Sequence, residues 1–283
     1  MDWAALGLQL VHATVLFMLL IDPKSNMQIH ECKEVALDLR SGDLCWTWID
    51  DLRPSQFAIG AFEVHENMKT LEAYSRQELR AKKRRAPVPI NIAPGGYLYM
   101  YNKHHTVRSM WDSKKIPAED KWVYATVDHN WSYLQSLTAF YRALVNRKLV
   151  WLTDHKGVQP MDPSLLPRHV KDLQNDPFRS LAAITKVYGC WSTSAANIPF
   201  VEFIWADHFR RHLSGQFSLF AVQRADTQKW CAIRPYSPVC IYDEAKLLSS
   251  LLDHALKFCD TPDALELPGA IERDGPFVPD HVP

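Results

Sequence analysis

The chain lacks the sequence motifs of several large enzyme classes. Its 283 residues contain no P-loop, no Gly-x-Gly-x-x-Gly, no Gly-x-Ser-x-Gly and no His-Glu-x-x-His. Each of these motifs places a phosphate-binding turn, a nucleophile or a pair of metal ligands where the chemistry needs it. Their absence argues against a Rossmann oxidoreductase, a serine hydrolase and a zinc protease. No internal repeat is present either.

The chain also lacks net charge, because 32 Lys and Arg residues balance 32 Asp and Glu residues. No global field therefore favours nucleic acid or an anionic membrane, and we do not expect nucleic acid as a partner. The one basic run is Arg80–Arg85. It is either the solvated C-terminal end of a helix, where cations suit the dipole, or a contact for a polyanion or an import receptor.

The six cysteines form no Cys-x-x-Cys pair and have no zinc-ligand spacing with histidine. We therefore expect buried thiols and no metal site, although secretion would reopen the question of disulfides. The sequon Asn130-Trp131-Ser132 is of a kind that often arises by chance.

A long apolar run extends from Trp3 to Ile21, interrupted by Gln9 and His12. It has no basic residues before it and no clear cleavage site, so a signal peptide, an anchor, a core helix and a misassigned N-terminus all remain open. Contact with a membrane is expected only through residues 3–21. A cytoplasmic location is favoured over secretion or membrane anchoring, and the sequence gives no indication of oligomeric state.

Strands and helices alternate over residues 45–146. The pattern predicts strands or extended runs at 44–50, 57–64, 88–92, 97–101 and 121–128, a turn at 52–54, and helices at 66–84, 104–113 and 130–146. Such alternation predicts an α/β or α+β layer structure.

Helices dominate from residue 163 onward. Asp176 and Pro177 supply a cap and a first-turn proline, which predicts a helix to Val187. A second helix is predicted over 199–213, an extended insertion over 216–243 and a helix over 245–258. The expected organisation is an apolar segment and connection (1–44), an α/β core (45–147), a helical extension of the same domain (148–215), and an insertion with a final helix and tail (216–283).

The most informative stretch is 93–111. A Pro94-Gly95-Gly96 turn joins two predicted strands, and the second delivers Asn102, Lys103, His104 and His105 to the start of a helix. Unpaired N–H groups and the dipole make a helix start a binding site for anions. Arg108 lies one turn further on and is expected to face the same anion.

Two interpretations of the histidine pair remain open. Either one imidazole binds phosphate and the other acts as donor or general acid, or the pair only caps the helix. Neighbouring helical side chains diverge by about 100°, which disfavours metal binding by His104 and His105 together.

The chain resembles a known family in several ordered blocks. The first is Leu52-Arg53-Pro54-Ser55-Gln56 with Gly60 and Glu63-Val64, and the second is Gly95-Gly96 before Asn102-Lys103-His104-His105. Two longer blocks lie at 151–182 and 199–210. Together they resemble the ParB-like nuclease family of the ParB/sulfiredoxin superfamily, whose motif has Asp where this chain has Asn102.

The resemblance implies a ParB/sulfiredoxin-like mixed sheet with additional C-terminal helices. Members of that superfamily bind nucleotides, so it also implies ATP, ADP or CTP with Mg²⁺ as ligand, and a catalytic role for Glu63, with Glu66 as competitor. Asn102 lacks the carboxylate that could hold a metal or orient a histidine, which puts catalysis in doubt.

Three further residues are candidates for ligand binding. Arg179 and Ser180 lie in the first turn after the Asp176-Pro177 cap and form either a second anion site or a structural tie. Glu202 is either a functional acid or a structural ion-pair partner. Asp207 and Arg211 are expected to pair on the surface.

Three functions follow. The first is a protein that binds a nucleotide or another phosphate-bearing small molecule at Asn102–Arg108 and transfers phosphate. The second is a nuclease or nucleic-acid-binding protein, as the family name suggests. The third is a non-catalytic or secreted protein that keeps the fold.

Overall fold

The computed structural model describes residues 29–196, 198–222 and 238–272. The chain divides into two compact units, residues 1–30 and residues 31–283, and everything below concerns the second. The apolar run 3–21 lies outside the described residues. None of the helices within the described ranges combines the length and apolarity needed to span a bilayer.

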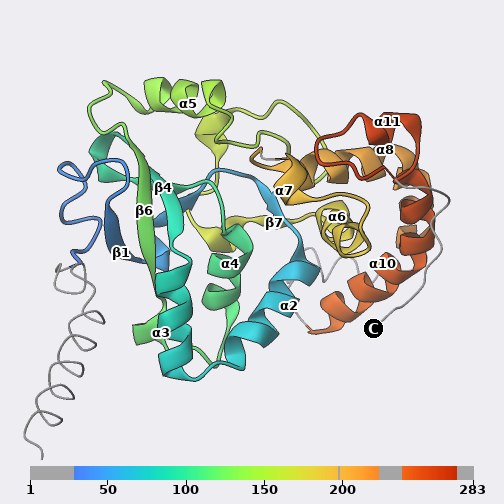
Figure 1. The fold of residues 1–283 in the computed structure, drawn as a ribbon, viewed down its shortest axis with the longest axis horizontal. Coiled ribbons are helices and arrows are strands. Elements are labelled where there is room, and N and C mark those ends of the chain that lie inside the picture. The colour runs from blue at the N-terminus through green and yellow to red at the C-terminus, as the bar shows by residue number, and fades with distance from the viewer. Residues whose placement is uncertain (1–28, 197, 223–237, 273–283) are drawn as a thin grey trace, which may run out of the picture. The chain divides into compact units, whose positions relative to one another are not determined.

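A five-stranded mixed sheet forms one part of this unit (Figure 1). Its order is β1 (Leu44–Trp48), β6 (Trp122–Asn130), β4 (Val88–Ile92), β5 (Leu98–Met100) and β2 (Leu52–Pro54). The pairs β4–β6 and β2–β5 are parallel, whereas β1–β6 and β4–β5 are antiparallel. The predicted mixed α/β fold is therefore confirmed. A separate short pair joins β3 (Ala58–Ile59) to β7 (Gln174–Asn175).

The turn between β4 and β5 follows the sequence closely. Gly95 and Gly96 have φ angles of 79° and 75°, which L side chains rarely adopt, and the Ala93 N–H donates to the Tyr97 carbonyl. The hairpin places the end of β5 directly before α4, as predicted.

Helices cover the sheet and form a second cluster at the other end of the unit (Figure 1). They are α2 (Ala61–Glu72), α3 (Arg76–Arg85), α4 (His104–Asp112), α5 (Leu137–Asn146), α6 (Pro177–Val187), α7 (Thr193–Ala196), α8 (Val201–Val222), α10 (Pro238–Phe258) and α11 (Pro262–Leu265). Short 3-10 helices are η1 (Ile49–Asp51), η2 (Pro94–Gly96), η3 (Ala118–Asp120), η4 (Pro163–Leu165) and η5 (Val170–Asp172).

Several predicted boundaries are wrong. The single helix at 66–84 is two helices, because Ser75 and Glu78 form a reciprocal capping box that starts α3. Residues 52–54 are a strand rather than a turn, since they pair with β5. The helix predicted over 130–146 begins only at Leu137, where Ser136 caps it.

The extended insertion predicted over 216–243 is contradicted where the chain is described. Residues up to Val222 continue α8 and residues from Pro238 begin α10, so both ends of that stretch are helical. Residues 223–237 lie outside the described ranges. The apolar faces of α6, α8 and α10 meet in one core cluster that includes Leu181, Phe209 and Leu251.

The basic run is only partly a solvated helix end. Lys83 is buried and donates to the Asp120 carbonyl, while Arg80 faces the buried Asp120 carboxylate. Burial lowers the pKa of Lys83 to about 8, against the opposing effect of Asp120. Two of the six positions thus anchor α3 to η3.

The expectation of buried thiols is wrong for four cysteines. Cys32 bonds to Cys45 and Cys190 bonds to Cys259, and all four are buried. Sequence spacing missed both pairs because the partners are brought together by the fold, across 13 and 69 residues. The side chains of the other two cysteines are not described. Asn130 of the sequon has a structural role, because its Nδ2 donates to the Ala36 and Leu39 carbonyls.

We predict that the Cys190–Cys259 disulfide contributes measurably to the free energy of unfolding. It closes a longer loop than Cys32–Cys45, so removing it should cost about 4 kcal/mol against about 3 kcal/mol in the chain-entropy description. Denaturant unfolding of the two paired Cys→Ser variants measures both. Equal stability of the wild type and the Cys190→Ser/Cys259→Ser variant would contradict the prediction.

Candidate functional site

The turn that precedes α4 is built by the polar residues singled out in the sequence. Lys103 is at the N-cap with φ 65°, and its N–H bonds to the side-chain oxygen of Asn102 at 2.7 Å. Asn102 therefore shapes the turn, while Lys103 is the N-cap residue. The turn directs His104 and His105 inward, where both are buried.

His104 has both ring nitrogens committed to the main chain. Its Nε2 accepts the Ser55 N–H at 3.3 Å, and the ring donates to the Met100 carbonyl. Burial, then the neighbouring His105, lowers its pKa to about 3. His104 is therefore a neutral tie between β5 and the segment after β2, and it offers no nitrogen to a ligand.

His105 contacts the start of α2. Its Nε2 accepts the Gly60 N–H at 3.2 Å and lies 3.3 Å from Glu63 Oε2. Burial and then Arg179 hold the pKa of His105 well below its ordinary value, opposed in part by Glu202. The ring is therefore neutral, and its contact with Glu63 is not an ion pair.

Arg179 lies between two carboxylates. Its Nη1 donates to Glu63 Oε2 at 2.9 Å, and its Nη2 lies 4.0 Å from Glu202 Oε1. The arginine side chain is 6% exposed, whereas those of Glu63 and Glu202 are 31% and 26% exposed. Within the described part of the chain, the buried Arg179 Nε has no hydrogen-bond partner. The structure thus brings together Glu63, His105, Arg179 and Glu202.

Arg108 does not belong to this cluster, contrary to expectation. Its Nε pairs with Asp112 at 2.7 Å and its Nη1 donates to the Val170 carbonyl at 2.7 Å. The side chain is drawn toward η5 by these partners and ties α4 to that segment. The guanidinium expected beside the histidines is supplied by Arg179 instead.

Ser180 lies between two helices, whereas Lys103 lies at the start of α4. Ser180 is fully buried against the start of α2, where a Cβ on Gly60 would lie 2.7 Å from Ser180 Oγ. The starts of α2 and α6 therefore approach closely at Ser180, and only glycine at position 60 leaves room for this contact. Lys103 is half-buried at the α4 N-cap.

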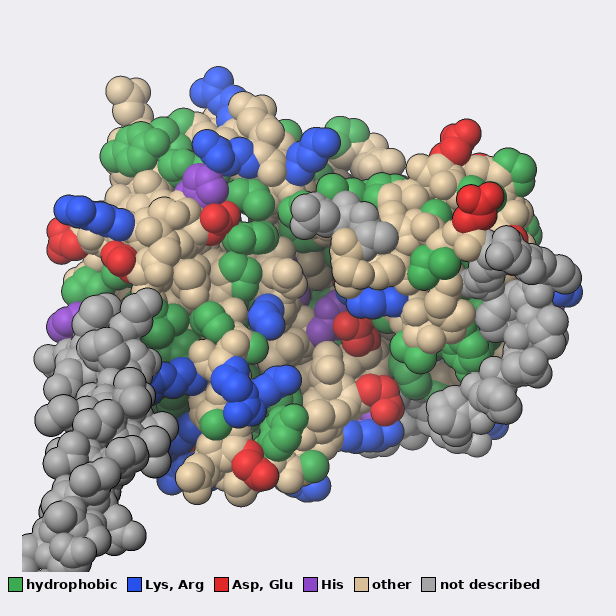
Figure 2. Space-filling view, viewed as in Figure 1, with side chains coloured by type: hydrophobic (Ala, Val, Ile, Leu, Met, Phe, Trp, Pro, Cys, Tyr) green, Lys and Arg blue, Asp and Glu red, His purple; other side chains and the backbone are tan. Residues whose placement is uncertain are grey.

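Four helices begin at the cluster. Glu63 is in the first turn of α2, His105 in that of α4, Arg179 in that of α6 and Glu202 in that of α8. Helix starts carry partial positive charge, so together they favour a bound anion. In Figure 2, histidine, acidic and basic side chains meet at a hollow near the centre of the visible face.

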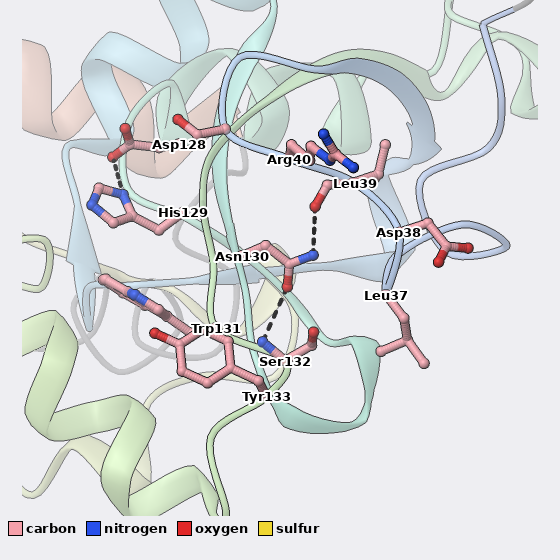
Figure 3. Close-up of a pocket in the computed structure, with 11 residues that line it drawn as sticks. Leu37, Asp38, Leu39, Arg40, Asp128, His129, Asn130, Trp131, Ser132 and Tyr133 are labelled. Carbon is pink, nitrogen blue, oxygen red and sulfur yellow. Dashed lines mark hydrogen bonds and ion pairs between the residues drawn. The ribbon is translucent and has the colours of Figure 1, made fainter.

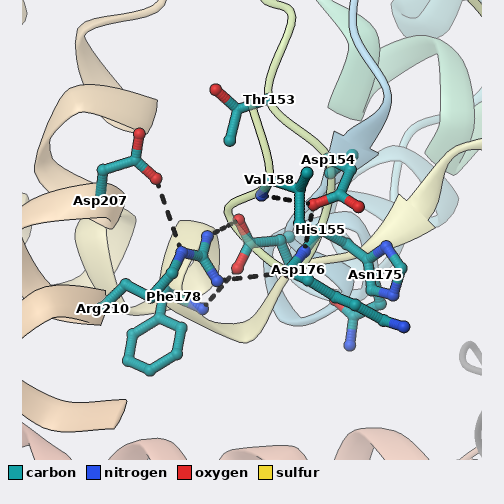
Figure 4. A network of polar contacts seen from close by, with 12 residues as sticks. Thr153, Asp154, His155, Val158, Asn175, Asp176, Phe178, Asp207 and Arg210 are labelled. Atoms are coloured by element: carbon teal, nitrogen blue, oxygen red, sulfur yellow. Dashed lines mark hydrogen bonds and ion pairs between the residues drawn. The ribbon is translucent and has the colours of Figure 1, made fainter. Parts of the chain in front are cut away.

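A buried network holds α6 in place (Figure 4). The Asp176 carboxylate accepts the Phe178 N–H and pairs with Arg210 Nη2 at 2.6 Å, while Arg210 Nε lies 3.5 Å from Asp207. Burial raises the pKa of Asp176, and Arg210 opposes that shift. Asp207 thus pairs with Arg210, not with Arg211 as predicted. The sequence identified Asp176 only as a cap and gave no signal for its ion pair.

A separate open pocket of about 760 Å³ lies between residues 37–41 and 128–133 (Figure 3). Asn130 Nδ2 donates to the Ala36 and Leu39 carbonyls, and His129 Nδ1 lies 3.1 Å from Asp128 Oδ2. None of the residues that line this pocket begins a helix, so we place the candidate site at the cluster of Glu63, His105, Arg179 and Glu202.

We predict that the buried histidines make the folded chain less stable in acid. The unfolded chain binds protons at its ordinary histidine pKa, while His104 in the folded chain stays neutral down to about 3. The free energy of unfolding should therefore fall by about 1.4 kcal/mol per pH unit for each such histidine as the pH drops below about 6.5. Urea unfolding at several pH values measures the slope. His104→Gln should reduce this slope by the contribution of one proton, about 1.4 kcal/mol per pH unit. An unchanged slope would contradict the assignment.

Comparisons with known proteins agree with this architecture. The family described as "Putative ParB-like nuclease" matches residues 45–211. The crystal structure of protein Atu1540 from Agrobacterium tumefaciens is similar at 24% identity and a TM-score of 0.62, over 82% of this chain and 98% of that one. That likeness concerns the fold. No curated protein matches the chain. Because the family covers more than half of the sequence, including every residue of the candidate site, the chain belongs to the ParB-like nuclease family.

Proposed function

We propose that the chain binds a phosphate-bearing small molecule, such as a nucleotide, beside Arg179, and cleaves or transfers its phosphate. The observation that carries the proposal is the meeting of four helix starts around one buried guanidinium flanked by two partly exposed carboxylates. The fork of arginine is a donor that phosphate prefers, and the dipoles of the helix starts favour an anion nearby.

The charges at the cluster decide how such a ligand would bind. Glu63 and Glu202 together exceed the single positive charge of Arg179, since His105 is neutral. A phosphate must therefore displace a carboxylate from Arg179 and take its place. The contact of Arg179 with Glu202 is the looser one, at 4.0 Å against 2.9 Å for Glu63. Exchange at the Glu202 side leaves Glu63 in position.

Of the three residues expected to be catalytic, Glu63 keeps that role and the two histidines lose it. His104 has no nitrogen available, and His105 uses Nε2 to hold Gly60. Glu63 is a partly exposed carboxylate held by Arg179 in the first turn of α2. In the proposed step, an oxygen of water or an alcohol attacks phosphorus, Glu63 takes the proton from that oxygen, and the P–O bond to the leaving oxygen breaks.

A resident Mg²⁺ does not fit the cluster as it stands, because the Arg179 guanidinium already lies between the two carboxylates. We therefore derive no step through a metal. Mg²⁺ remains an expectation only as the counterion that accompanies a nucleotide.

Cleavage of a nucleic acid is the second candidate, and family membership favours it. The same attack on phosphorus would serve a phosphodiester. The balanced charge of the chain and the anchoring of Lys83 and Arg80 by η3 favour a small ligand instead. A non-catalytic protein that keeps the fold is the third, and Asn102 favours it.

Thermal and denaturant unfolding with ATP, ADP, CTP or a DNA oligomer, each with and without Mg²⁺, tests the proposal. A nucleotide at 100 times its Kd should stabilise the wild type by about 2.7 kcal/mol. Arg179→Lys should remove most of that gain because lysine lacks the planar fork. The matched control is Arg84→Lys on the exposed face of α3, which should keep the gain. Stabilisation by DNA alone would favour the second candidate, and no response to any ligand the third.

Glu63→Gln separates binding from chemistry. The amide keeps the shape but cannot accept the proton, so ligand-dependent stabilisation should persist while phosphate release falls at least about 100-fold. Turnover is followed as inorganic phosphate or cleaved oligomer. Wild-type turnover in Glu63→Gln would rule out the assigned base.

We also propose that the chain matures in an oxidising compartment, in place of the cytoplasm favoured at first. Two buried disulfides support this, because such bonds are rare in reducing compartments. Alkylation of the denatured protein should leave Cys32, Cys45, Cys190 and Cys259 unmodified until a reductant is added. Modification of all four before reduction, in protein that was folded and stable, would contradict the proposal.

A further inference from the structure

A second cluster of polar side chains lies away from the proposed site, between α8 and α11. His208 and His212 are one turn apart on α8, and Asp263 is in the first turn of α11. One ligating atom of each lies within 4.8 Å of the others, and no other group of three such residues in the described ranges meets that limit. The proposed phosphate chemistry gives this cluster no role.

One carboxylate oxygen faces both imidazoles. Asp263 Oδ2 lies 3.4 Å from His208 Nδ1 and 3.0 Å from His212 Nε2. Ligands bound tetrahedrally at 2.0–2.1 Å from a zinc ion are separated by about 3.3 Å. The two imidazole nitrogens therefore lie at distances from Asp263 Oδ2 that are close to those between neighbouring ligands on one ion.

The tautomer of His208 is fixed by its other nitrogen. Nε2 lies 3.0 Å from the Phe258 carbonyl, which can only accept, so Nε2 carries the proton. In the neutral ring Nδ1 then holds a lone pair. That atom is buried, has no hydrogen-bond partner among the described residues, and points toward the Asp263 oxygen.

His208 Nδ1 is a buried acceptor that faces the Asp263 carboxylate, which also hydrogen-bonds to His212 Nε2, so a positive species between these atoms would be stabilised. A metal ion is such a species and uses the arrangement as it stands. A histidine whose second nitrogen donates to a backbone carbonyl is also the usual form of a metal-ligating imidazole. A proton on Nδ1 is the competing solution, and it would make His208 the partner of Asp263 in an ion pair.

We propose that His208 Nδ1, His212 Nε2 and Asp263 bind a divalent first-row metal ion, with Zn²⁺ the best match. Two imidazoles and one carboxylate are ligands typical of zinc. The side chains of His212 and Asp263 are 30% and 51% exposed, which leaves room for water to complete the coordination.

The position of the cluster gives the ion a structural role. It would link α8 to α11, and the Phe258 carbonyl that orients His208 comes just before Cys259 of the Cys190–Cys259 disulfide. Metal and disulfide would then fasten the same end of α10 to the rest of the helical cluster. This site is independent of the proposed phosphate chemistry.

Calorimetric titration of the EDTA-treated full chain with ZnCl₂, together with thermal unfolding with and without ZnCl₂, tests the proposal. The wild type should bind one ion at this site and unfold at a higher temperature in its presence. His212→Ala and Asp263→Asn each remove a partly exposed ligand, and each should weaken binding at least tenfold. Co²⁺ in place of Zn²⁺ should give the visible absorption of a low-coordinate site in the wild type only.

His254→Ala and Asp253→Asn are matched controls, since both residues are exposed on α10. They should leave the affinity and the metal-dependent shift in unfolding temperature unchanged. Absence of any zinc-dependent shift in the wild type would overturn the proposal and leave His208 and Asp263 as an ion pair. Equal affinity in the wild type, His212→Ala and Asp263→Asn would also overturn it, because the ion would then bind elsewhere.

Discussion

The buried carboxylate of Asp176 is the constraint on which the candidate site depends. It caps α6, pairs with Arg210 of α8, and its own N–H donates to the Ile59 carbonyl just before α2 begins. One residue therefore links α2, α6 and α8, the helices that carry Glu63, Arg179 and Glu202. A buried charge of this kind is tolerated only when it is fully partnered, and Arg210 supplies the partner.

The close approach of helix starts sets the electrostatics. Gly60 lies against Ser180 with no room for a side chain, which brings the positive ends of α2 and α6 together. Two glutamates and a neutral histidine are the stable complement of that field. Burial, with Arg179 beside His105, keeps the imidazoles unprotonated, so they act as hydrogen-bond acceptors for Ser55 and Gly60 and not as acids.

The sheet end and the helical end of the unit each combine an apolar core with a disulfide. The sheet packs against a cluster that includes Ile90, Met100 and Val107 and holds Cys32–Cys45, whereas α6, α8 and α10 share their own core and the Cys190–Cys259 disulfide. The His208–His212–Asp263 cluster lies in that helical part. The Cys190–Cys259 disulfide stabilises this part because it restricts the unfolded chain.

Local patterns in the sequence determined the β4–turn–β5–α4 unit, the Asp176-Pro177 start of α6, and the alternation that identifies a mixed α/β fold, because hydrophobic period, glycine turns and caps act over a few residues. Family resemblance pointed to Glu63, and the residues themselves pointed to Arg179 and Glu202 as candidates. Only the tertiary structure decided that Arg179 and not Arg108 meets His105, that Asp207 pairs with Arg210, and that four cysteines form disulfides. These ion pairs and disulfides depend on which segments the fold brings into contact, and the spacing of residues along the chain does not reveal those contacts.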